Sequence, residues 1–432
     1  MSWRKTLRSA RQGRRTRVAG NATIQVRGLR LALLFGAGLI GAPGLVAQKF
    51  LDDISDALAF STPQGTARVD FSGTFDVEGY VFQDPAPGLI FGDAPFVNPR
   101  LTLFGEAQLG TQWYSYAQFQ ANRGFDPGAA VRNAQFYEYL LRWTPSPEGT
   151  VNLQVGEFAT CFGNWVKRHL SWENPFVTAP TPYEQVLTIS DVNAPPGPKA
   201  FLARRALPAN KRAWVPLIWG PSYTTGASIF GSVEKLDYAV EFKNASISSR
   251  PAVWSGFDQG WSSPTVTTRV GWRPAPAWNI GISGSGGAYL LPSAVPTLPA
   301  GTSLNDFPQF TTGLDVSWSR QRWQIWSELF LSRFDVPNVG NADLLGWYAE
   351  TKYKVTTHLW AAARMNVMVF GEVPDGLGGE AQWDNKAWRL DLALGWRFNQ
   401  HWQMKVQYSY GREQSPGVQG NSLFAGQITL KF

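Results

Sequence analysis

The chain has 432 residues, of which 14% are aromatic and 16% are charged, so it is rich in rings and poor in charge for a soluble protein of this length. Its formal net charge is +7, but nine of its 39 basic residues lie within residues 1–47, which contain no acid. The 30 basic residues that remain face 32 acidic ones, which excludes an overall basic surface for nucleic acid. The single cysteine, Cys161, excludes an intrachain disulfide.

The first segment, residues 1–47, joins those basic residues to an apolar run from Leu31 to Ala47. We predict a secretory signal peptide that is cleaved near Ala47. A membrane anchor is disfavoured because Gly and Pro interrupt the run, which falls short of the roughly 20 apolar residues of a spanning helix. Residues 48–65 are expected to be a short periplasmic leader, either a short helix or a disordered segment.

From residue 66 to residue 432 the dominant pattern is an alternation of apolar and polar residues. In Val69–Val81 the odd positions are apolar or Gly and the even ones are polar or Tyr, which predicts a strand with one apolar face. The same pattern recurs in Arg100–Leu109, Gln112–Asn122, Gln135–Trp143, Val151–Phe158, Tyr223–Val233, Leu236–Asn244, Val266–Arg273, Trp278–Ser285, Phe310–Ser319, Trp323–Arg333, Leu344–Val355, Leu359–Phe370, Trp388–Phe398, Trp402–Gly411 and Leu423–Phe432. The sequence therefore predicts an all-β chain of about 16 strands.

Short and long connections alternate between these segments. The short ones have two to seven residues, as in Glu234-Lys235, whereas the longest, residues 159–222, is the third of the eight long loops. This alternation is typical of a transmembrane antiparallel up-and-down β-barrel spanning residues 66–432, with turns at one end and loops at the other. A barrel without a free edge is the only sheet that hydrocarbon tolerates, so the first and last strands should pair. We therefore predict a location in the outer membrane.

The two faces of each strand should differ in role. Outward side chains must be apolar, since a midplane Arg or Lys there costs about 2 to 4 kcal/mol, so the polar faces should line the lumen. Tryptophans beside the short turns, such as Trp143, Trp318 and Trp360, are interpreted as an aromatic girdle at the membrane boundary. The basic residues expected to face the lumen are Arg100, Arg142, Arg269, Arg364, Arg389 and Arg397. A barrel of this strand number leaves an aqueous channel.

The long third loop carries most of the candidates for a pore constriction that binds anions. These basic residues are Lys167, Arg168, Lys199, Arg204, Arg205, Lys211 and Arg212, and no acid follows Asp191 until Glu234. If the loop folds into the lumen, its cations would attract anions, because a narrow low-dielectric passage focuses the field. The alternative is an external loop whose cations meet the phosphates of lipopolysaccharide.

One stretch resembles a known family. Val151–Gly163 contains Gly156-x-Phe158 followed by Phe162-Gly163, and with Arg100–Phe104, Arg123–Gly128 and Tyr139–Pro145 it is similar to the phosphate-selective porin O and P type. The similarity is specific over residues 100–163, and Cys161 stands where members often have proline. The resemblance implies a third loop folded into the lumen, a homotrimer and transport of phosphate-like anions. The terminal Phe432 resembles the signal read by the outer-membrane assembly machinery.

We therefore predict a porin for passive diffusion of small hydrophilic solutes, with no cofactor, no metal and no catalysis. A barrel phospholipase is disfavoured, because His169-Leu-Ser171 lies in a polar loop rather than at a lipid-facing strand end. The three histidines are scattered along the chain, which disfavours a metal site. A plugged transporter for hydrophobic compounds, or a structural or adhesin barrel, remains the alternative, although residues 48–65 are too few for a plug.

Overall fold

The computed structural model describes residues 44–83, 86–91, 94–122, 133–413 and 420–432. The predicted signal peptide, except for residues 44–47, and the Arg123–Gly128 motif lie outside the described residues. Among the helices of the described residues, none is both long and apolar enough to cross a membrane.

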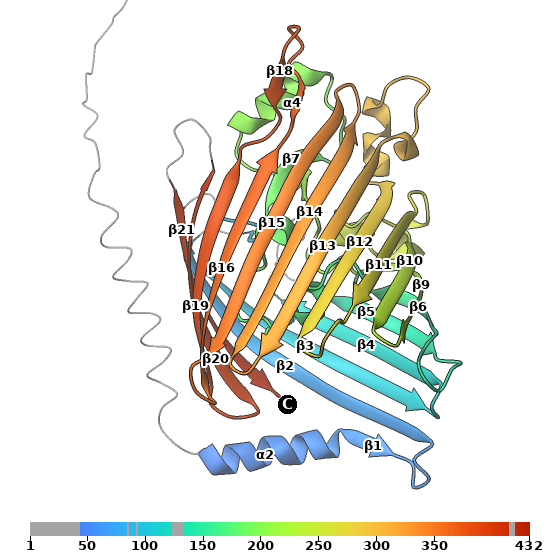
Figure 1. Ribbon diagram of the computed structural model, residues 1–432, viewed down its shortest axis with the longest axis vertical. Helices are drawn as coiled ribbons and strands as arrows, with labels where there is room; N and C mark the ends of the chain where they lie inside the picture. Colours follow the sequence, from blue (N-terminus) through green and yellow to red (C-terminus); the bar gives the residue numbers. More distant parts are fainter. Residues whose placement is uncertain (1–43, 84–85, 92–93, 123–132, 414–419) are drawn as a thin grey trace, which may run out of the picture. The chain divides into compact units, whose positions relative to one another are not determined.

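Sixteen strands of the described residues form one closed antiparallel sheet, in which each strand pairs with its neighbours in the chain (Figure 1). The barrel closes because β2 pairs with β3 on one side and with β21 on the other, as in Val77 opposite Ile428. The strands are β2 (Ala67–Phe82), β3 (Phe96–Leu109), β4 (Trp113–Asn122), β5 (Asn133–Trp143), β6 (Asn152–Phe158), β9 (Thr224–Val233), β10 (Leu236–Lys243), β11 (Thr265–Trp272), β12 (Trp278–Ala288), β13 (Pro308–Arg320), β14 (Trp323–Val336), β15 (Gly340–Lys354), β16 (Leu359–Phe370), β19 (Ala387–Arg397), β20 (Trp402–Glu413) and β21 (Asn421–Lys431). The prediction of an antiparallel barrel of about 16 strands is confirmed.

The short turns and the C-terminus lie at one end of the barrel, here called the turn end, and the long connections at the other, the loop end (Figure 1). Smaller elements in the connections are α3 (Thr181–Glu184), β7 (Val186–Ser190), α4 (Pro198–Ala203), β8 (Trp214–Pro216), α5 (Gly256–Gln259), β17 (Glu372–Pro374) and β18 (Glu380–Gln382). Residues 334–343, expected to be a long loop, instead make a tight hairpin in which Val336 is opposite Gly340. Continued pairing of β14 with β15 satisfies backbone groups that a loop would leave to water.

The outer surface of the barrel is apolar, as a membrane requires. Large apolar side chains on the outward positions are exposed, and they include Phe71, Phe75, Leu103, Val155, Phe242, Val270, Ile282, Phe310, Leu331 and Leu392. On the same strands the intervening polar residues are buried, as in Asp391 beside Leu392. Water cannot cover such a surface favourably, so the barrel is transmembrane.

The tryptophans near the short turns divide into two groups. Trp143, Trp278 and Trp323 are exposed on the outer surface, as expected of a girdle. Trp360 is different: it is only 5% exposed and lies on the inner face of β16, where the Lys352 ammonium is 4.6 Å from its ring centre. A position next to a turn therefore does not by itself assign a side chain to the membrane boundary.

The segment before the first barrel strand is a helix, α2 (Gly44–Ala57), followed by the short strand β1 (Ala59–Ser61), which pairs with β2. His401, in the turn between β19 and β20, lies 2.8 Å from the Asp52 carboxylate of α2. Of the two alternatives for residues 48–65, the structure has the helix, here over residues 48–57, and the cleavage site near Ala47 stays a prediction.

Candidate functional site

The third loop, residues 159–222, folds into the barrel and lies against one side of its inner wall; it is called loop 3 below. Carboxylates of two strands, β10 and β14, accept hydrogen bonds from its first part. Glu241 of β10 accepts a hydrogen bond from the Cys161 N–H at 2.9 Å. Glu328 of β14 accepts the N–H groups of Asn164 and Trp165 at 2.6 and 2.7 Å. The acids of this wall thus act as acceptors for loop backbone.

Side chains of three further strands donate hydrogen bonds to the next part of loop 3. The Lys405 ammonium of β20 donates to the carbonyls of Ser171, Asn174 and Phe176 at 2.8, 2.9 and 3.0 Å. Arg364 of β16 donates to the Thr178 carbonyl at 3.1 Å. Arg389 of β19 donates to the Ala179 carbonyl at 2.6 Å. Acceptors on β10–β14 and donors on β16–β20 therefore hold residues 161–179 along the wall.

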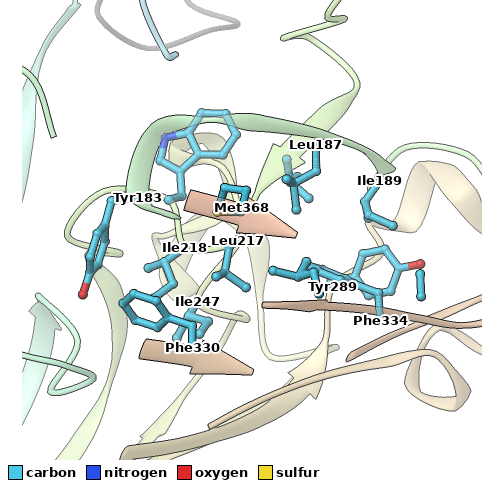
Figure 2. Packing of buried hydrophobic residues seen from close by; sticks show 14 of the residues in the cluster. Tyr183, Leu187, Ile189, Leu217, Ile218, Ile247, Tyr289, Phe330, Phe334 and Met368 are labelled. Atoms are coloured by element: carbon cyan, nitrogen blue, oxygen red, sulfur yellow. The ribbon is translucent and has the colours of Figure 1, made fainter. Parts of the chain in front are cut away.

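An apolar cluster fills the space between loop 3 and strands β14–β16. Phe162, Tyr183, Leu217 and Ile218 of loop 3 pack with inward residues such as Phe330. Figure 2 shows part of this cluster. Burial of these side chains stabilises the loop by about 1.5 to 3 kcal/mol for each large one. That side of the barrel interior is therefore filled with packed side chains.

Two glycines permit this packing. Gly163 has a φ of +69°, and a Cβ there would lie 2.7 Å from the Tyr183 hydroxyl and 2.9 Å from Glu328 Oε2. Gly281 of β12 lies against the buried ion pair of Arg269 and Asp315, whose atoms are 2.7 Å apart. Because glycine has no side chain, both partners have room there. The Phe162-Gly163 motif is thus explained by the packing of loop 3.

The opposite side of loop 3 borders a cavity of about 170 Å³. Strands β2, β3, β4 and β21 form one wall of this cavity with polar side chains, which include Thr74, Thr102, Gln118, Gln120 and Gln427. Loop 3 and its neighbours form the facing wall largely with rings, which include Trp165, His169, Tyr183, Trp219 and Tyr223. We call this space the loop 3 cavity.

Arg100, the basic residue of the strand wall of the loop 3 cavity, is paired with two carboxylates. Arg100 donates to Asp76 at 3.3 Å and to Glu78 at 2.5 Å. The Tyr80 hydroxyl also donates to Glu78 at 2.9 Å. One cation is thus shared by two carboxylates, so this wall carries no excess of positive charge.

The other predicted lumen arginines are also bonded inside the barrel. Arg269 pairs with Asp315, Arg364 with Asp391 at 2.8 Å, and Arg389 with both Asp391 and Glu184. Arg142 and Arg397 instead donate to the amide oxygens of Gln154 and Gln403 at 2.9 and 3.0 Å. Most of these side chains are therefore engaged in holding the wall and loop 3 together.

The predicted constriction cations do not gather at the loop 3 cavity. Arg168 is buried and pairs with Glu350 at 2.5 Å, whereas Lys167 is exposed. Lys199 and Arg212 are exposed, and Lys199 belongs to α4, which lies beside β18 at the loop end (Figure 1).

The remaining three predicted cations donate to backbone carbonyls, Arg204 within loop 3 and Arg205 and Lys211 on other segments. Arg204 donates to the Thr188 carbonyl at 3.1 Å and Arg205 to that of Gln382 at 2.5 Å. Lys211 donates to the carbonyls of Ala86 and Ile90 at 2.6 and 2.5 Å, and its burial lowers the pKa of this ammonium to about 8. Gln382, Ala86 and Ile90 belong to two of the long connections, so the contacts of Arg205 and Lys211 lie at the loop end.

Of the residues that border the cavity, sequence reasoning singled out Arg100 as facing the lumen, but not Asp76, Gln118 or Trp165. Asp76 and Gln118 lie on polar faces of predicted strands, so the alternation indicates that they point inward. Trp165 gives no such signal, because its place depends on the course of loop 3. In the described residues, no cluster of potential ligands fit for a metal ion is present.

Comparisons with known proteins give structural neighbours only. No family model and no curated protein matches the sequence. OmpT of Vibrio cholerae, an outer-membrane protein, superposes with a TM-score of 0.52 at 9% identity over 87% of this chain and 100% of its own. The outer-membrane channel DcaP of Acinetobacter baumannii gives 0.53 at 8% identity over 86% and 99%. OmpF of Salmonella typhi, in complex with daunomycin, gives 0.51 at 12% identity over 86% and 100%. These likenesses support the barrel fold.

Proposed function

We propose that the chain is a porin of the outer membrane, through which small hydrophilic solutes diffuse passively. The observation that carries the proposal is the course of loop 3: it is bonded to β10–β20 on one side and borders a polar-walled cavity on the other. The structural neighbours are outer-membrane proteins and include a channel, which agrees with this function. Passage requires no bond to be made or broken, so the porin is not an enzyme.

The test is the current carried by the purified mature chain in a planar bilayer, with a KCl gradient across it. Stable, ohmic single-channel steps are the expected result. A folded barrel, recognised by its heat-dependent migration on gels, that gives no steps would overturn the proposal. That outcome would favour a structural or adhesin barrel, in which the apolar cluster around loop 3 closes the lumen, or a plugged transporter.

A preference for anions is the second part of the proposal. It rests on the basic residues of loop 3, among which Arg204 and Arg205 contact backbone carbonyls rather than acids in the described structure. The Asp76–Arg100–Glu78 group at the cavity acts in the opposite direction, because two carboxylates flank one guanidinium. The net preference for anions should therefore be weak. Phosphate-like anions are one class of solute to be tested in the bilayer measurement.

The double substitution Arg204→Glu and Arg205→Glu should shift the reversal potential toward cations, lowering the anion-to-cation permeability ratio about twofold or more. Lys235→Glu with Arg320→Glu is the matched control, because it makes the same charge change at short turns of the turn end. An equal effect of both pairs, or none from the first, would remove Arg204 and Arg205 from the conduction path.

Three further features of the proposal rest on sequence and resemblance. The chain is exported with a cleaved signal peptide, assembled through its terminal Phe432, and forms a homotrimer in contact with lipopolysaccharide. Phe432 exchanges backbone hydrogen bonds with Gly73 at 2.9 and 3.0 Å, next to the closing seam of the barrel. Native mass spectrometry of the detergent-solubilised protein tests the trimer, and a monomer would overturn that part.

A further inference from the structure

The two walls of the loop 3 cavity differ in chemistry. The strand wall offers amides and hydroxyls, among them Gln118, Gln120 and Thr102, whereas the facing wall offers rings such as Trp165 and Tyr223. A solute that fits both walls has an apolar face and polar groups around its edge. Aromatic rings favour contact with such apolar faces, and amides hydrogen-bond hydroxyl groups in either direction.

The size of the cavity restricts the solute to a single ring. Its volume is about 170 Å³. An engineered cavity of roughly 150 Å³ in another protein holds one benzene molecule. A six-membered ring is therefore near the upper limit, unless loop 3 moves.

The charge at the cavity favours a neutral solute. Arg100 is already shared by Asp76 and Glu78, so an anion would meet two carboxylates beside one engaged cation. A cation would meet carboxylates whose hydrogen-bonding capacity is taken up by Arg100, Thr429 and Gln427. Hydroxyl groups carry no charge that such a site must compensate.

Each wall also retains an unsatisfied polar atom. Trp165 Nε1 and Gln427 Oε1 are buried and have no hydrogen-bond partner in the described structure, and both residues border the cavity. An unpaired buried donor or acceptor costs about 1 to 3 kcal/mol. A hydroxylated solute is able to form a hydrogen bond with each of these two atoms, after small movements of the side chains.

We propose that the loop 3 cavity is a binding site for a neutral, hydroxylated six-membered ring, that is, a monosaccharide in its pyranose form. The proposal rests on the pore function, since it assigns the solute class of that same passage. Transient binding of the sugar in the cavity interrupts the ion current, as the site is occupied by one solute at a time.

The experiment measures the ion current of the open channel while D-glucose is added in steps. A saturable decrease in current is expected with glucose. Glycerol, which has hydroxyl groups but no ring, should change the current only in proportion to its effect on bulk conductivity. Inorganic phosphate should not compete with glucose for the site.

Two variants test the walls separately. Trp165→Phe keeps a ring but removes the indole N–H, and should raise the half-blocking concentration of glucose about twofold to tenfold. Gln120→Leu removes one amide of the strand wall and should act in the same direction. Trp318→Phe is the matched control, because Trp318 lies near a short turn at the other end of the barrel, and should leave the half-blocking concentration unchanged.

The outcomes separate the two proposals. Absence of single-channel steps would overturn the pore function itself. Normal steps with no saturable block by glucose, or equal block by glycerol, would overturn the sugar site while the pore stands. Saturable block by phosphate alone would also overturn it and assign the cavity to anions.

Discussion

At the scale of single residues, Gly163 is the position where loop 3 depends most on the absence of a side chain. Its φ of +69° and the closeness of Tyr183 and Glu328 both oppose a Cβ. We expect Gly163→Ala to destabilise the barrel by about 1 to 3 kcal/mol, the cost of a non-glycine residue held in such a conformation. The measurement is the midpoint of urea unfolding in detergent micelles.

Gly79→Ala is the control for this prediction. A Cβ at Gly79 meets nothing within 4 Å, and its backbone is in an ordinary strand conformation. Equal midpoints for the two variants would mean that Tyr183 and Glu328 move aside freely. The packing of loop 3 against β14 would then be looser than the structure indicates.

At the scale of elements, the fixed course of loop 3 depends on donors from β16, β19 and β20. Lys405→Met leaves the carbonyls of Asn174 and Phe176 without their ammonium donor, while the Ser171 carbonyl keeps only its hydrogen bond from Gln403. Each unsatisfied buried acceptor costs about 1 to 3 kcal/mol, so this part of the loop should detach at intervals. Under the proposed pore function, single-channel records should show added transitions to a higher conductance.

Lys352→Met is the matched control for Lys405→Met. Lys352 lies on β15 of the same barrel wall, and in the described structure its ammonium is placed over the Trp360 ring rather than on loop carbonyls. Its removal should leave the transitions at the level of the unmodified protein. Similar records from both variants would exclude a specific role of Lys405 in holding loop 3.

At the scale of the whole molecule, the barrel is closed by the pairing of its first and last strands. Val77 lies opposite Ile428, and the Cα atoms of such antiparallel partners are about 4.5 to 5.5 Å apart, within reach of a disulfide. In a Cys161→Ser background, Val77→Cys with Ile428→Cys should therefore oxidise to a crosslink. The measurement is the gel mobility of the unfolded chain with and without reductant.

A second pair of cysteines on the same outward face is the control for the register of this strand pairing. Phe424 lies opposite Val81, four residues along β2 from Val77, so the strand rise separates Val77 from Phe424 by about 13 Å. Val77→Cys with Phe424→Cys should remain uncrosslinked. A crosslink in the control alone would show that the seam closes in a different register.

The strands were predictable because their signal is local. In a membrane barrel each strand residue faces either lipid or the interior. Apolar and polar residues therefore alternate along every strand, as in Val69–Val81 of β2. Exceptions arise where the pairing with a neighbouring strand, and not the local pattern, sets the direction of a side chain. Trp360 has the composition of a girdle residue, but its place on the inner face of β16 follows from strand pairing.

The candidate site was less accessible from sequence, because its partners are far apart in the chain. The sequence indicated a long third loop with basic residues, and the polar strand faces indicated which side chains point inward. It did not indicate that Lys405 bonds to Asn174, that Arg205 bonds to Gln382, or that Trp165 and Gln118 border the same cavity.

The sequence by itself therefore determined the barrel, the direction of its faces and the position of loop 3 in the chain order. These follow from burial and backbone hydrogen bonding, which act residue by residue along a strand. Only the tertiary structure decided which cations are neutralised, which side of the lumen loop 3 fills, and where a cavity remains. Those outcomes depend on pairwise contacts between distant segments, whose energies have no counterpart in any local pattern.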